Sequence, residues 1–470
     1  MRDPAEQTLT AVQSPLSPGE QKDRAVLLVM GSADSPALSA RARLQITGDD
    51  LFIGRRAEGL PVSANAAVLD DGLVSSQHAR LTRGSGGYDL EDLGSKNGTW
   101  VDNQRLDGQP GQEGKTGKVR LRDGALIFFG NHVAVFRMVS QIELEAIKAE
   151  LVAPFGPVAT ASPALAVACD RLRRLAASEG ELLILGETGV GKEVYARAVH
   201  QASGRQGKGR FVAINCAAIP RELVESELFG YRQGAHSTAH QAKAGLIEEA
   251  EGGTLFLDEI GEMSPEAQIK ILRFLQDREL TPLGSTRPRR MDVRIVAATN
   301  RIAAGPGKGP GGLRDDIVAR LGASPIYLPP LRNRIEDLGA LTAHFLGRAS
   351  SGVKFEQPAF RALALHAWPL NVRELEKIIS TAAVLTGGDK PIALRDLPEP
   401  IARVLTAPAV VGARRTNGPS PTPAQIEESL RRYEGNVADV SRELGKHRAA
   451  VWRWIKKFGL DPQKFRREGQ

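Results

Sequence analysis

The hydrophobic positions of this chain follow two different patterns in two long regions. Between about residues 25 and 138, short apolar runs alternate with Gly, Asp and Asn turns, as in ARLQIT, LFIGR, HARLT, YDLEDL, TWVDN, ALIFFG and VAVFRMV. Short runs at this close spacing predict a β-sandwich. From Pro154 to about Arg403, strand-like runs such as LLILGE, FVAINC, TLFLDE and RIVAATN alternate with helical stretches. That alternation predicts an α/β domain with a parallel sheet.

Shorter segments lie before, between and after these two regions. Residues 1–24 are polar and contain three prolines, a composition typical of a disordered tail. The run IELEAIKAEL predicts a linker helix within residues 141–153. Residues 404–422 are rich in Pro, Gly and Ser, which indicates a second linker. Residues 423–470 are predicted to be helical and basic.

Length and composition indicate a multi-domain protein of the cytoplasm. A chain of 470 residues is long enough for about three domains. Its apolar fraction of 41% and charged fraction of 25% are those of soluble globular proteins. The two cysteines, Cys169 and Cys216, imply no disulfide framework and favour a reducing compartment. The run AVLLVM is too short to cross a membrane or to act as a signal sequence.

A phosphate-binding loop opens the α/β region. LLILGETGVGKE places the pattern GxxxxGK after a predicted strand and at the start of a predicted helix. The glycines let backbone amides point at phosphate oxygens, and Lys192 can reach the outer phosphates. The candidate nucleotide-binding residues are Gly186, Glu187, Thr188, Gly189, Val190, Gly191, Lys192 and Glu193. Glu193 stands where the generic motif has the Ser or Thr ligand of Mg²⁺.

Two carboxylates follow a later buried strand and complete a candidate ATP and Mg²⁺ site. In GGTLFLDE, Asp258 is placed to bind Mg²⁺ and Glu259 to polarise the attacking water. The run AATN ends another strand, and Asn300 can orient that water and the γ-phosphate. Two acids after a strand often mark only a solvated strand end, and the loop upstream favours the functional interpretation.

The order of the motifs in this region resembles that in bacterial enhancer-binding proteins. These are AAA+ ATPases that activate sigma-54 RNA polymerase. The resemblance covers about residues 154–402 and rests on GETGVGKE, FVAINCAAIP, ESELFG, GGTLFLDEIGEM, VRIVAATN, LRDDIVARL, LPPLRNRIEDL and WPLNVREL. It implies an α/β subdomain over residues 154–330 and a helical lid over residues 331–403. Members of the family also carry Glu at the position of Glu193, and Leu370 stands where they usually have Gly.

The resemblance also implies roles for individual residues and an oligomeric ring. Asn215 would pair with Glu259 as a nucleotide-sensing switch, and Arg373 would be the lid arginine that touches the nucleotide. Arg314 and Arg320 would be arginine fingers inserted into the neighbouring subunit's site. An arginine supplied in trans stabilises the transition-state charge, so hydrolysis would require a homo-oligomer, expected to be a hexamer.

A loop inside this domain is the expected mechanical output. In the family the equivalent segment carries GAFTGA and grips sigma-54. Here the six residues read GAHSTA, and they are Gly234, Ala235, His236, Ser237, Thr238 and Ala239. The aromatic anchor is replaced by His236, and a glycine is replaced by Thr238. Loss of an aromatic anchor typically costs about 2 kcal/mol at an interface.

The N-terminal region resembles a forkhead-associated (FHA) domain, which binds phosphothreonine peptides. The motifs are FIGRR, VSSQHARL and LEDLGSKNGTWVDN, within a domain expected over residues 25–140. The resemblance implies that Arg55 and Ser75 hold the phosphate, that Asn97 bonds the peptide backbone and that His78 braces the loop, while Lys96 adds charge. A generic sandwich whose turns contain these residues is the alternative. The implied partner is a phosphothreonine protein or a Ser/Thr kinase.

The C-terminal segment carries most of the net charge and is a candidate DNA-binding unit. The chain has a charge of +7, and residues 442–467 hold nine Lys/Arg and two Asp/Glu, so 9 − 2 = +7. Val451, Trp454, Ile455 and Phe458 form a stripe with helical spacing that predicts a packed core. The candidate DNA-binding residues lie off that stripe and are Lys446, His447, Arg448, Trp452, Arg453, Lys456 and Lys457. The segment resembles the Fis-type helix-turn-helix, and a basic solvated helix is the alternative.

The sequence therefore predicts a cytoplasmic regulator with three functional domains. An FHA phosphothreonine sensor would control an oligomeric AAA+ ATPase that binds enhancer DNA and remodels the sigma-54 RNA polymerase holoenzyme. The first alternative is a sigma-54-independent DNA-binding ATPase, which the GAHSTA loop favours. The second is a phosphopeptide-dependent DNA-binding adaptor without significant hydrolysis.

Overall fold

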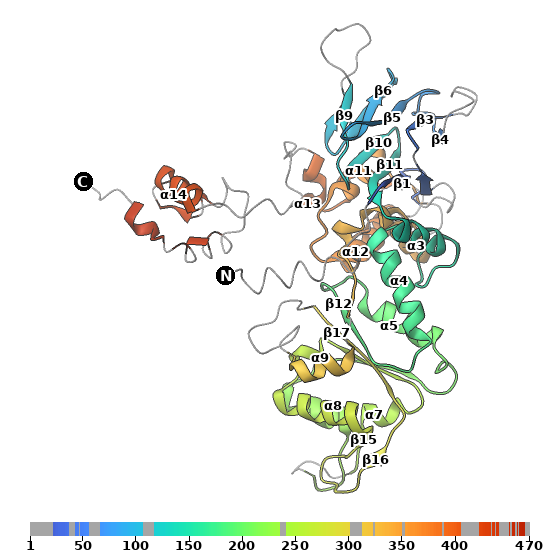
Figure 1. The fold of residues 1–470 in the computed structure, drawn as a ribbon. Helices are drawn as coiled ribbons and strands as arrows, with labels where there is room; N and C mark the ends of the chain where they lie inside the picture. Colours follow the sequence, from blue (N-terminus) through green and yellow to red (C-terminus); the bar gives the residue numbers. More distant parts are fainter. Residues whose placement is uncertain are drawn as a thin grey trace. The chain divides into compact units, whose positions relative to one another are not determined.

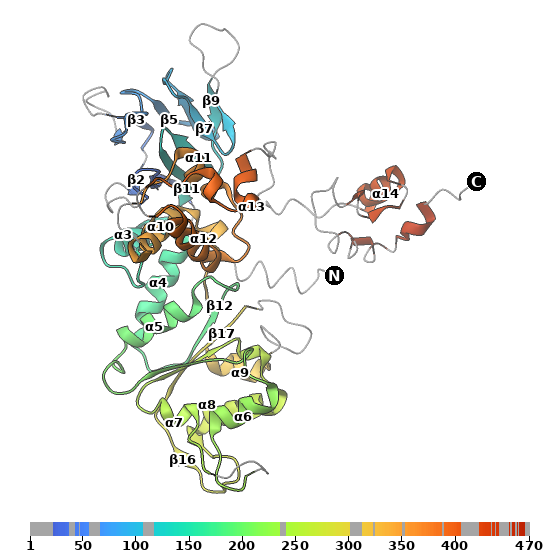
Figure 2. The same cartoon turned by 180° about the vertical axis from the view of Figure 1, so that it is seen from behind.

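The chain divides into two compact units, Met1–Thr406 and Ala407–Gln470. The computed structural model describes residues 22–36, 43–46, 48–55, 66–106, 117–235, 241–300, 313–322, 325–349, 353–387, 390–405, 423–433, 435–437, 439–440, 451, 454–455, 458 and 460–465. The first unit contains a β-sandwich, a parallel α/β domain and a helical lid, all drawn in Figures 1 and 2. Within the described residues, no helix is both long enough and apolar enough to cross a membrane.

The N-terminal domain is the predicted sandwich of two sheets. One sheet has the order β2-β1-β11-β10-β7-β8 and the other β4-β3-β5-β6-β9. Leu27, Ile53, Leu81 and Phe129 come from both sheets and share one core. The strands are β1 (Arg24–Ser32), β2 (Leu44–Ile46), β3 (Asp50–Gly54), β4 (Ala66–Val68), β5 (Ala79–Gly84), β6 (Gly87–Asp92), β7 (Thr99–Val101), β8 (Gln104–Arg105), β9 (Lys118–Arg120), β10 (Leu126–Phe129) and β11 (His132–Val139).

Strand β1 is apolar at consecutive positions because it is buried on both faces. Leu27 and Val29 face the core between the sheets. Val26 and Leu28 pack instead with helices α3 (Gln141–Val152) and α4 (Pro163–Ala176). Helix α3 is the predicted linker helix, and it begins at a capping box between Ser140 and Glu143. The run AVLLVM therefore joins the sandwich to the neighbouring helices.

The α/β domain contains the predicted parallel sheet, with the strand order β13-β14-β17-β12-β18. Alternate side chains of β12 enter two cores, with Leu183 and Leu185 on one face and Leu182 and Ile184 on the other. The strands are β12 (Leu182–Leu185), β13 (Phe211–Asn215), β14 (Thr254–Asp258), β17 (Arg294–Thr299) and β18 (Ile326–Tyr327). The helices after α4 are α5 (Lys192–Ala202), α6 (Arg221–Phe229), α7 (Leu246–Glu249), α8 (Pro265–Asp277) and α9 (Asp315–Leu321), with a short turn η2 (Ile260–Glu262).

The helical lid and the sandwich share one hydrophobic core. Met30, Phe128 and Val135 of the sandwich pack with Leu338 and Phe360 of the lid. In both views helix α11 lies beside β11 (Figures 1 and 2). The lid elements are η4 (Leu331–Asn333), η5 (Ile335–Asp337), α10 (Leu338–Ala349), α11 (Gln357–Leu365), α12 (Asn371–Leu385), η6 (Leu394–Asp396), α13 (Glu399–Ala402) and η7 (Arg403–Leu405).

The second unit has a small core of its own. It contains α14 (Pro423–Arg432) and η8 (Pro462–Phe465). The predicted core stripe is confirmed, because Val451 and Ile455 are buried while Trp454 and Phe458 pack partly buried against them. All seven candidate DNA-binding residues, from Lys446 to Lys457, lie outside the described residues.

Candidate functional site

The phosphate-binding loop connects β12 to α5, as the motif predicts. Gly189 and Gly191 have positive φ angles of 79° and 101°. A Cβ on Gly189 would also lie 2.3 Å from the carbonyl oxygen of Leu370 in the lid. Position 189 therefore requires glycine for two reasons: its φ is positive, and a side chain would collide with the lid. Gly191 ends the loop as the N-cap of α5, so the helix N-terminus faces the cavity.

The lysine of the loop is buried and ion-paired with the second carboxylate. Lys192 Nζ donates to Gly186 O at 3.1 Å and to Glu259 Oε1 at 3.0 Å. The side chains of Lys192 and Glu259 are only 6% and 14% exposed. Glu259 itself has φ 51° and ψ 47°, a left-handed conformation that is uncommon outside glycine. In this conformation the Glu259 carboxylate lies against Lys192 of the loop.

Asn300 and Thr188 extend this network across the mouth of the loop. Asn300 donates its backbone N–H to Glu259 Oε2 at 2.9 Å and its Nδ2 to Thr188 Oγ1 at 3.2 Å. Asn215 lines the same cavity, and its Oδ1 accepts the Ala217 amide at 2.9 Å. Glu259 is thus paired with Lys192 and Asn300, and the pairing with Asn215 that the resemblance implied is not the arrangement in this structure.

Asp258 ends β14 next to Glu259 and carries a perturbed carboxyl group. Burial raises the pKa of Asp258 above its usual value, the neighbouring Glu259 raises it further, and the Lys192 ammonium opposes the rise. Because burial disfavours its charge, this carboxylate gains from a cation placed against it, which fits a divalent-ion ligand. Within the described residues, no group of three His, Cys, Asp or Glu side chains could hold a metal by itself.

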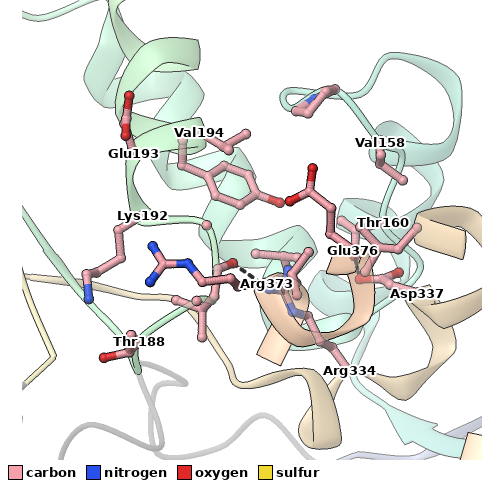
Figure 3. A pocket seen from close by; sticks show the side chains of 18 of the residues that line it. Val158, Thr160, Thr188, Lys192, Glu193, Val194, Arg334, Asp337, Arg373 and Glu376 are labelled. Carbon is pink, nitrogen blue, oxygen red and sulfur yellow. Dashed lines mark hydrogen bonds between the residues drawn. The ribbon is translucent and has the colours of Figure 1, made fainter. Parts of the chain in front are cut away.

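These side chains line one cavity of about 940 Å³. Figure 3 shows Lys192 and Thr188 on one side of it and Val158, Thr160 and Asp337 on the other. The polar end contains the phosphate-binding loop, and the opposite end contains apolar side chains suited to a nucleotide base. The apolar residues that line the cavity include Pro157, Val158, Ala159, Leu165, Leu341 and Phe345. Arg373, the predicted lid arginine, also lines the cavity.

The lid donates hydrogen bonds to backbone carbonyls of the phosphate-binding loop. Asn371 Nδ2 donates to Thr188 O at 3.0 Å, and the Val372 amide donates to Gly189 O at 3.0 Å. Arg332 forms a bidentate ion pair with Glu187, which lowers the pKa of that carboxyl. The sequence singled out Glu187 but not Arg332 or Asn371, although both lie in motifs of the resemblance.

The structure explains why leucine is accepted at position 370. Leu370 has φ −103° and ψ 17°, which any residue can adopt. The positive φ angles of this turn fall instead on Trp368 at 52° and Asn371 at 58°. The Leu370 side chain points to solvent, since the residue is 57% exposed. The glycine usual in the family is therefore not required by the backbone here.

The two predicted arginine fingers do not line the nucleotide cavity of this chain. Arg314 caps α9, is exposed, and forms an ion pair with Asp316 in the same turn at 2.8 Å. Arg320 is also exposed, and its Nε donates to Leu275 O at 3.3 Å. Neither residue lines the cavity that holds Lys192.

The structure describes the base of the GAHSTA loop. Tyr231 and Lys243 exchange backbone hydrogen bonds and close the loop at its base. The Arg232 amide donates to Leu283 O, in the segment that joins β15 (Glu279–Leu280) to β16 (Arg289–Arg290). Gly234 and Ala235 belong to this braced base. The other four residues of the motif, His236, Ser237, Thr238 and Ala239, lie outside the described residues.

The five candidate phosphopeptide-binding residues lie on loops of the sandwich that are bonded to one another. The Arg55 amide donates to Ser75 O at 3.0 Å, and Ser75 Oγ accepts the Lys96 amide at 3.0 Å. Asn97 Nδ2 donates to Leu73 O at 2.7 Å. Lys96 and Asn97 are exposed. The three loops therefore form one surface with cationic and amide groups.

A buried histidine and a half-buried aspartate hold these loops in place. His78 Nδ1 accepts the Ser75 amide at 3.1 Å, and burial lowers the pKa of His78, so the ring is neutral near pH 7. Asp92 accepts from the Gly94 and Ser95 amides and from the Ser95 and Thr99 hydroxyls. The sequence pointed to His78 but not to Asp92, whose signal was the turn-forming DLGS stretch.

Three family models match successive parts of the chain. Residues 51–130 match the FHA domain, residues 158–327 the Sigma-54 interaction domain and residues 332–409 the AAA+ ATPase lid domain.

Known relatives match large parts of the chain. The chain is 40% identical over 323 residues to regulatory protein AtoC of Escherichia coli (strain K12), and the match covers 66% of this chain and 69% of AtoC. It is 43% identical over 274 residues to the DNA-binding transcriptional regulator NtrC of Rhizobium meliloti (strain 1021), covering 57% of this chain and 56% of NtrC. Among solved structures, NtrX from Brucella abortus in complex with ATP is 31% identical, with a TM-score of 0.46, covering 65% of this chain and 70% of that chain.

The family models and the AtoC relationship agree with the arrangement of the P-loop, lid and sandwich. The chain belongs to the sigma-54-dependent AAA+ transcriptional activator family and carries an FHA domain.

Proposed function

We propose that this chain is an ATP-hydrolysing regulator that remodels the sigma-54 RNA polymerase holoenzyme under the control of phosphothreonine recognition. One observation carries the proposal. Lys192, Glu259 and Arg373 line a single cavity, whereas Arg314 and Arg320 of the same protomer lie outside it. A site that has its nucleotide-binding groups but lacks a transition-state cation is suited to completion by a neighbouring subunit.

Nucleotide binding uses the loop and the lid together. The N-terminus of α5, Lys192 and Arg373 provide positive charge for the phosphates. Asp258 would hold Mg²⁺, which neutralises phosphate charge when bound. The apolar end of the cavity receives the base.

Glu259 is the proposed general base. Its carboxylate forms an ion pair with the Lys192 ammonium. A γ-phosphate competes for that ammonium, so nucleotide binding frees the carboxylate to accept a proton from the attacking water. The backbone N–H of Asn300 keeps the carboxylate oriented during this exchange.

Hydrolysis is conditional on a ring, which we propose is a hexamer. Arg314 and Arg320 from one protomer reach the cavity of the next and stabilise charge on the transferred phosphoryl group. Their exposure on α9 agrees with this role. Monomers would then hydrolyse ATP slowly.

Two further surfaces would couple this ATPase to its partners: the GAHSTA loop to RNA polymerase and the FHA domain to a phosphorylated protein. The GAHSTA loop, braced against the β15–β16 segment, transmits the nucleotide state to the holoenzyme. The surface formed by Arg55, Ser75, Lys96 and Asn97 binds a phosphothreonine peptide from a partner protein or a Ser/Thr kinase. The C-terminal unit binds enhancer DNA as a helix-turn-helix.

A sigma-54-independent ATPase regulator is the second candidate, and the replacement of GAFTGA by GAHSTA favours it. Transcription by purified sigma-54 polymerase, with ATP or with a non-hydrolysable analogue, separates the two. The proposal expects open-complex formation only with ATP. Hydrolysis without open complexes supports the second candidate, and absence of hydrolysis supports a phosphopeptide-dependent DNA-binding adaptor.

A further inference from the structure

The base-side wall of the nucleotide cavity is fastened to the lid by one carboxylate. Asp337 accepts the Thr160 hydroxyl through Oδ2 at 2.6 Å and the Ala161 amide through Oδ1 at 2.8 Å. Thr160 and Asp337 both line the cavity, on the side opposite Lys192 (Figure 3). The position of this wall therefore depends on how Asp337 is held.

The cation that holds Asp337 comes from the FHA domain. Arg43 lies immediately before β2, and its side chain is 4% exposed. Its Nη2 contacts Asp337 Oδ1 and Glu336 O, each at 3.4 Å, and its Nη1 donates to Ala159 O at 2.8 Å. One guanidinium thus joins the segment before α4 to the segment before α10. A planar fork with several donors is suited to such a bridge, and a lysine ammonium is not.

Asp337 depends on this arginine for its countercharge. Its side chain is 3% exposed, and among the described residues Arg43 is the cation that forms an ion pair with it. A buried carboxylate that loses its partner is strongly destabilised and repositions or takes up a proton. Either change loosens the hydrogen bonds to Thr160 and Ala161.

Other contacts dock the sandwich on the same part of the lid. Arg137 of β11 donates to Glu336 Oε2 at 2.9 Å, and the Glu336 side chain is fully buried. Arg361 of α11 lies over the Trp100 ring at 3.8 Å, and the Phe355 amide donates to Ala33 O at 2.8 Å. Arg137 and Glu336 belong to the joint, but neither lines the cavity. The joint and the wall can therefore be tested separately.

We propose that Arg43 is a positioning residue of the nucleotide site, so that the FHA domain completes the wall that receives the nucleoside. The inference rests on the proposed binding of nucleotide in this cavity. It predicts a selective defect: loss of Arg43 weakens contacts to the base and ribose and leaves contacts to the phosphates unchanged. A general loss of folding would weaken the contacts to the nucleoside and the contacts to the phosphates equally.

The test compares ADP with inorganic tripolyphosphate as probes of the full chain, each with Mg²⁺, by isothermal titration calorimetry. For Arg43→Met we expect about tenfold weaker ADP binding, because a displaced wall no longer fits the nucleoside. Tripolyphosphate affinity should stay within about twofold of the original, since the phosphate-binding groups are unchanged. Arg43→Lys should recover part of the ADP affinity, because it restores charge without the fork.

Arg137→Met is the matched control, because it breaks an ion pair of the same joint one residue away from Asp337. It should weaken ADP binding less than Arg43→Met does. Equal losses in the two variants, or unchanged ADP affinity in a folded Arg43→Met, would overturn the inference. If Arg43→Met does not fold, Arg43→Lys provides the test. Full ADP affinity in Arg43→Lys would contradict a role for the guanidinium group of Arg43. Failure of the unaltered chain to bind ADP would count instead against the proposed nucleotide site.

Discussion

The nucleotide cavity and helix α9 present their cations in opposite ways. In the cavity, Lys192 is 6% exposed and bonded to Gly186 O and Glu259, and Arg334 donates to Val190 O. On α9, Arg314 and Arg320 are exposed, and their contacts stay within their own turn or reach one backbone carbonyl. A buried cation that is bonded within its own cavity can act only at that cavity. An exposed cation beside a motif is free to serve another molecule.

The largest effect should follow removal of the exposed finger. Arg314→Ala should reduce kcat for ATP hydrolysis by about 10³-fold and leave the affinity for ADP nearly unchanged, because a finger acts in the transition state. A phosphate-release assay and ADP titration measure the two quantities. Arg314→Lys should recover part of the rate. A large loss of ADP affinity would indicate that Arg314 contacts nucleotide in the cavity of its own chain. It would then act like the cavity cations and not like a residue supplied to a neighbour.

Removal of the buried lysine should affect both binding and turnover. Lys192→Ala should lower kcat/KM for ATP by about 10²-fold or more, because a preorganised charge in a protected site has no substitute. ADP affinity should fall in the same variant, unlike Arg314→Ala. Lys208→Ala, an exposed lysine of the same domain, is the control. Retention of ADP affinity in Lys192→Ala would contradict the role of Lys192 in binding the nucleotide phosphates.

The FHA surface carries a third set of cations, Arg55 and Lys96, which can be compared with those of the cavity and of α9. Arg55→Ala should weaken binding of a degenerate phosphothreonine peptide pool by about 10-fold or more, since a hydrogen bond to a charged group is worth about 1.5–3 kcal/mol. Binding should also weaken with added salt, because Lys96 is exposed. Fluorescence anisotropy measures both. Arg83→Ala, on β5 away from the loops, should leave affinity unchanged. Equal binding of unphosphorylated peptides would exclude a phosphate-reading surface.

The smallest effect should come from the lid turn. Leu370→Gly should change the free energy of unfolding by no more than about 1 kcal/mol, because the φ of −103° needs no glycine. Denaturant unfolding measures it. A stabilisation well above that size would show that leucine strains the turn that grips Gly189.

Local motifs predicted the parts of the molecule whose geometry is set within a few residues. The strand–loop–helix around Lys192 and the sandwich were both predicted, because backbone amides, glycines and apolar alternation act at short range. The uninterrupted run of β1 was uninformative about its neighbours, since apolarity on both faces does not say which elements cover them.

Contacts between distant segments could not be predicted. Arg43 and Asp337 are 294 residues apart, and neither stands out in composition or spacing. The resemblance implied Asn215 as the partner of Glu259, whereas in this structure the Glu259 carboxylate is bonded to Lys192 and Asn300. Such choices depend on which donors the folded backbone delivers.

The most direct test of shared sites is to mix two inactive variants. Lys192→Ala has a damaged cavity but an intact finger, and Arg314→Ala has the reverse. If fingers act in trans, ATPase activity should return on mixing equal amounts, with about a quarter of the interfaces complete in randomly mixed rings. If the mixture stays as inactive as its components although the variants assemble together, hydrolysis does not depend on an arginine from the neighbouring protomer.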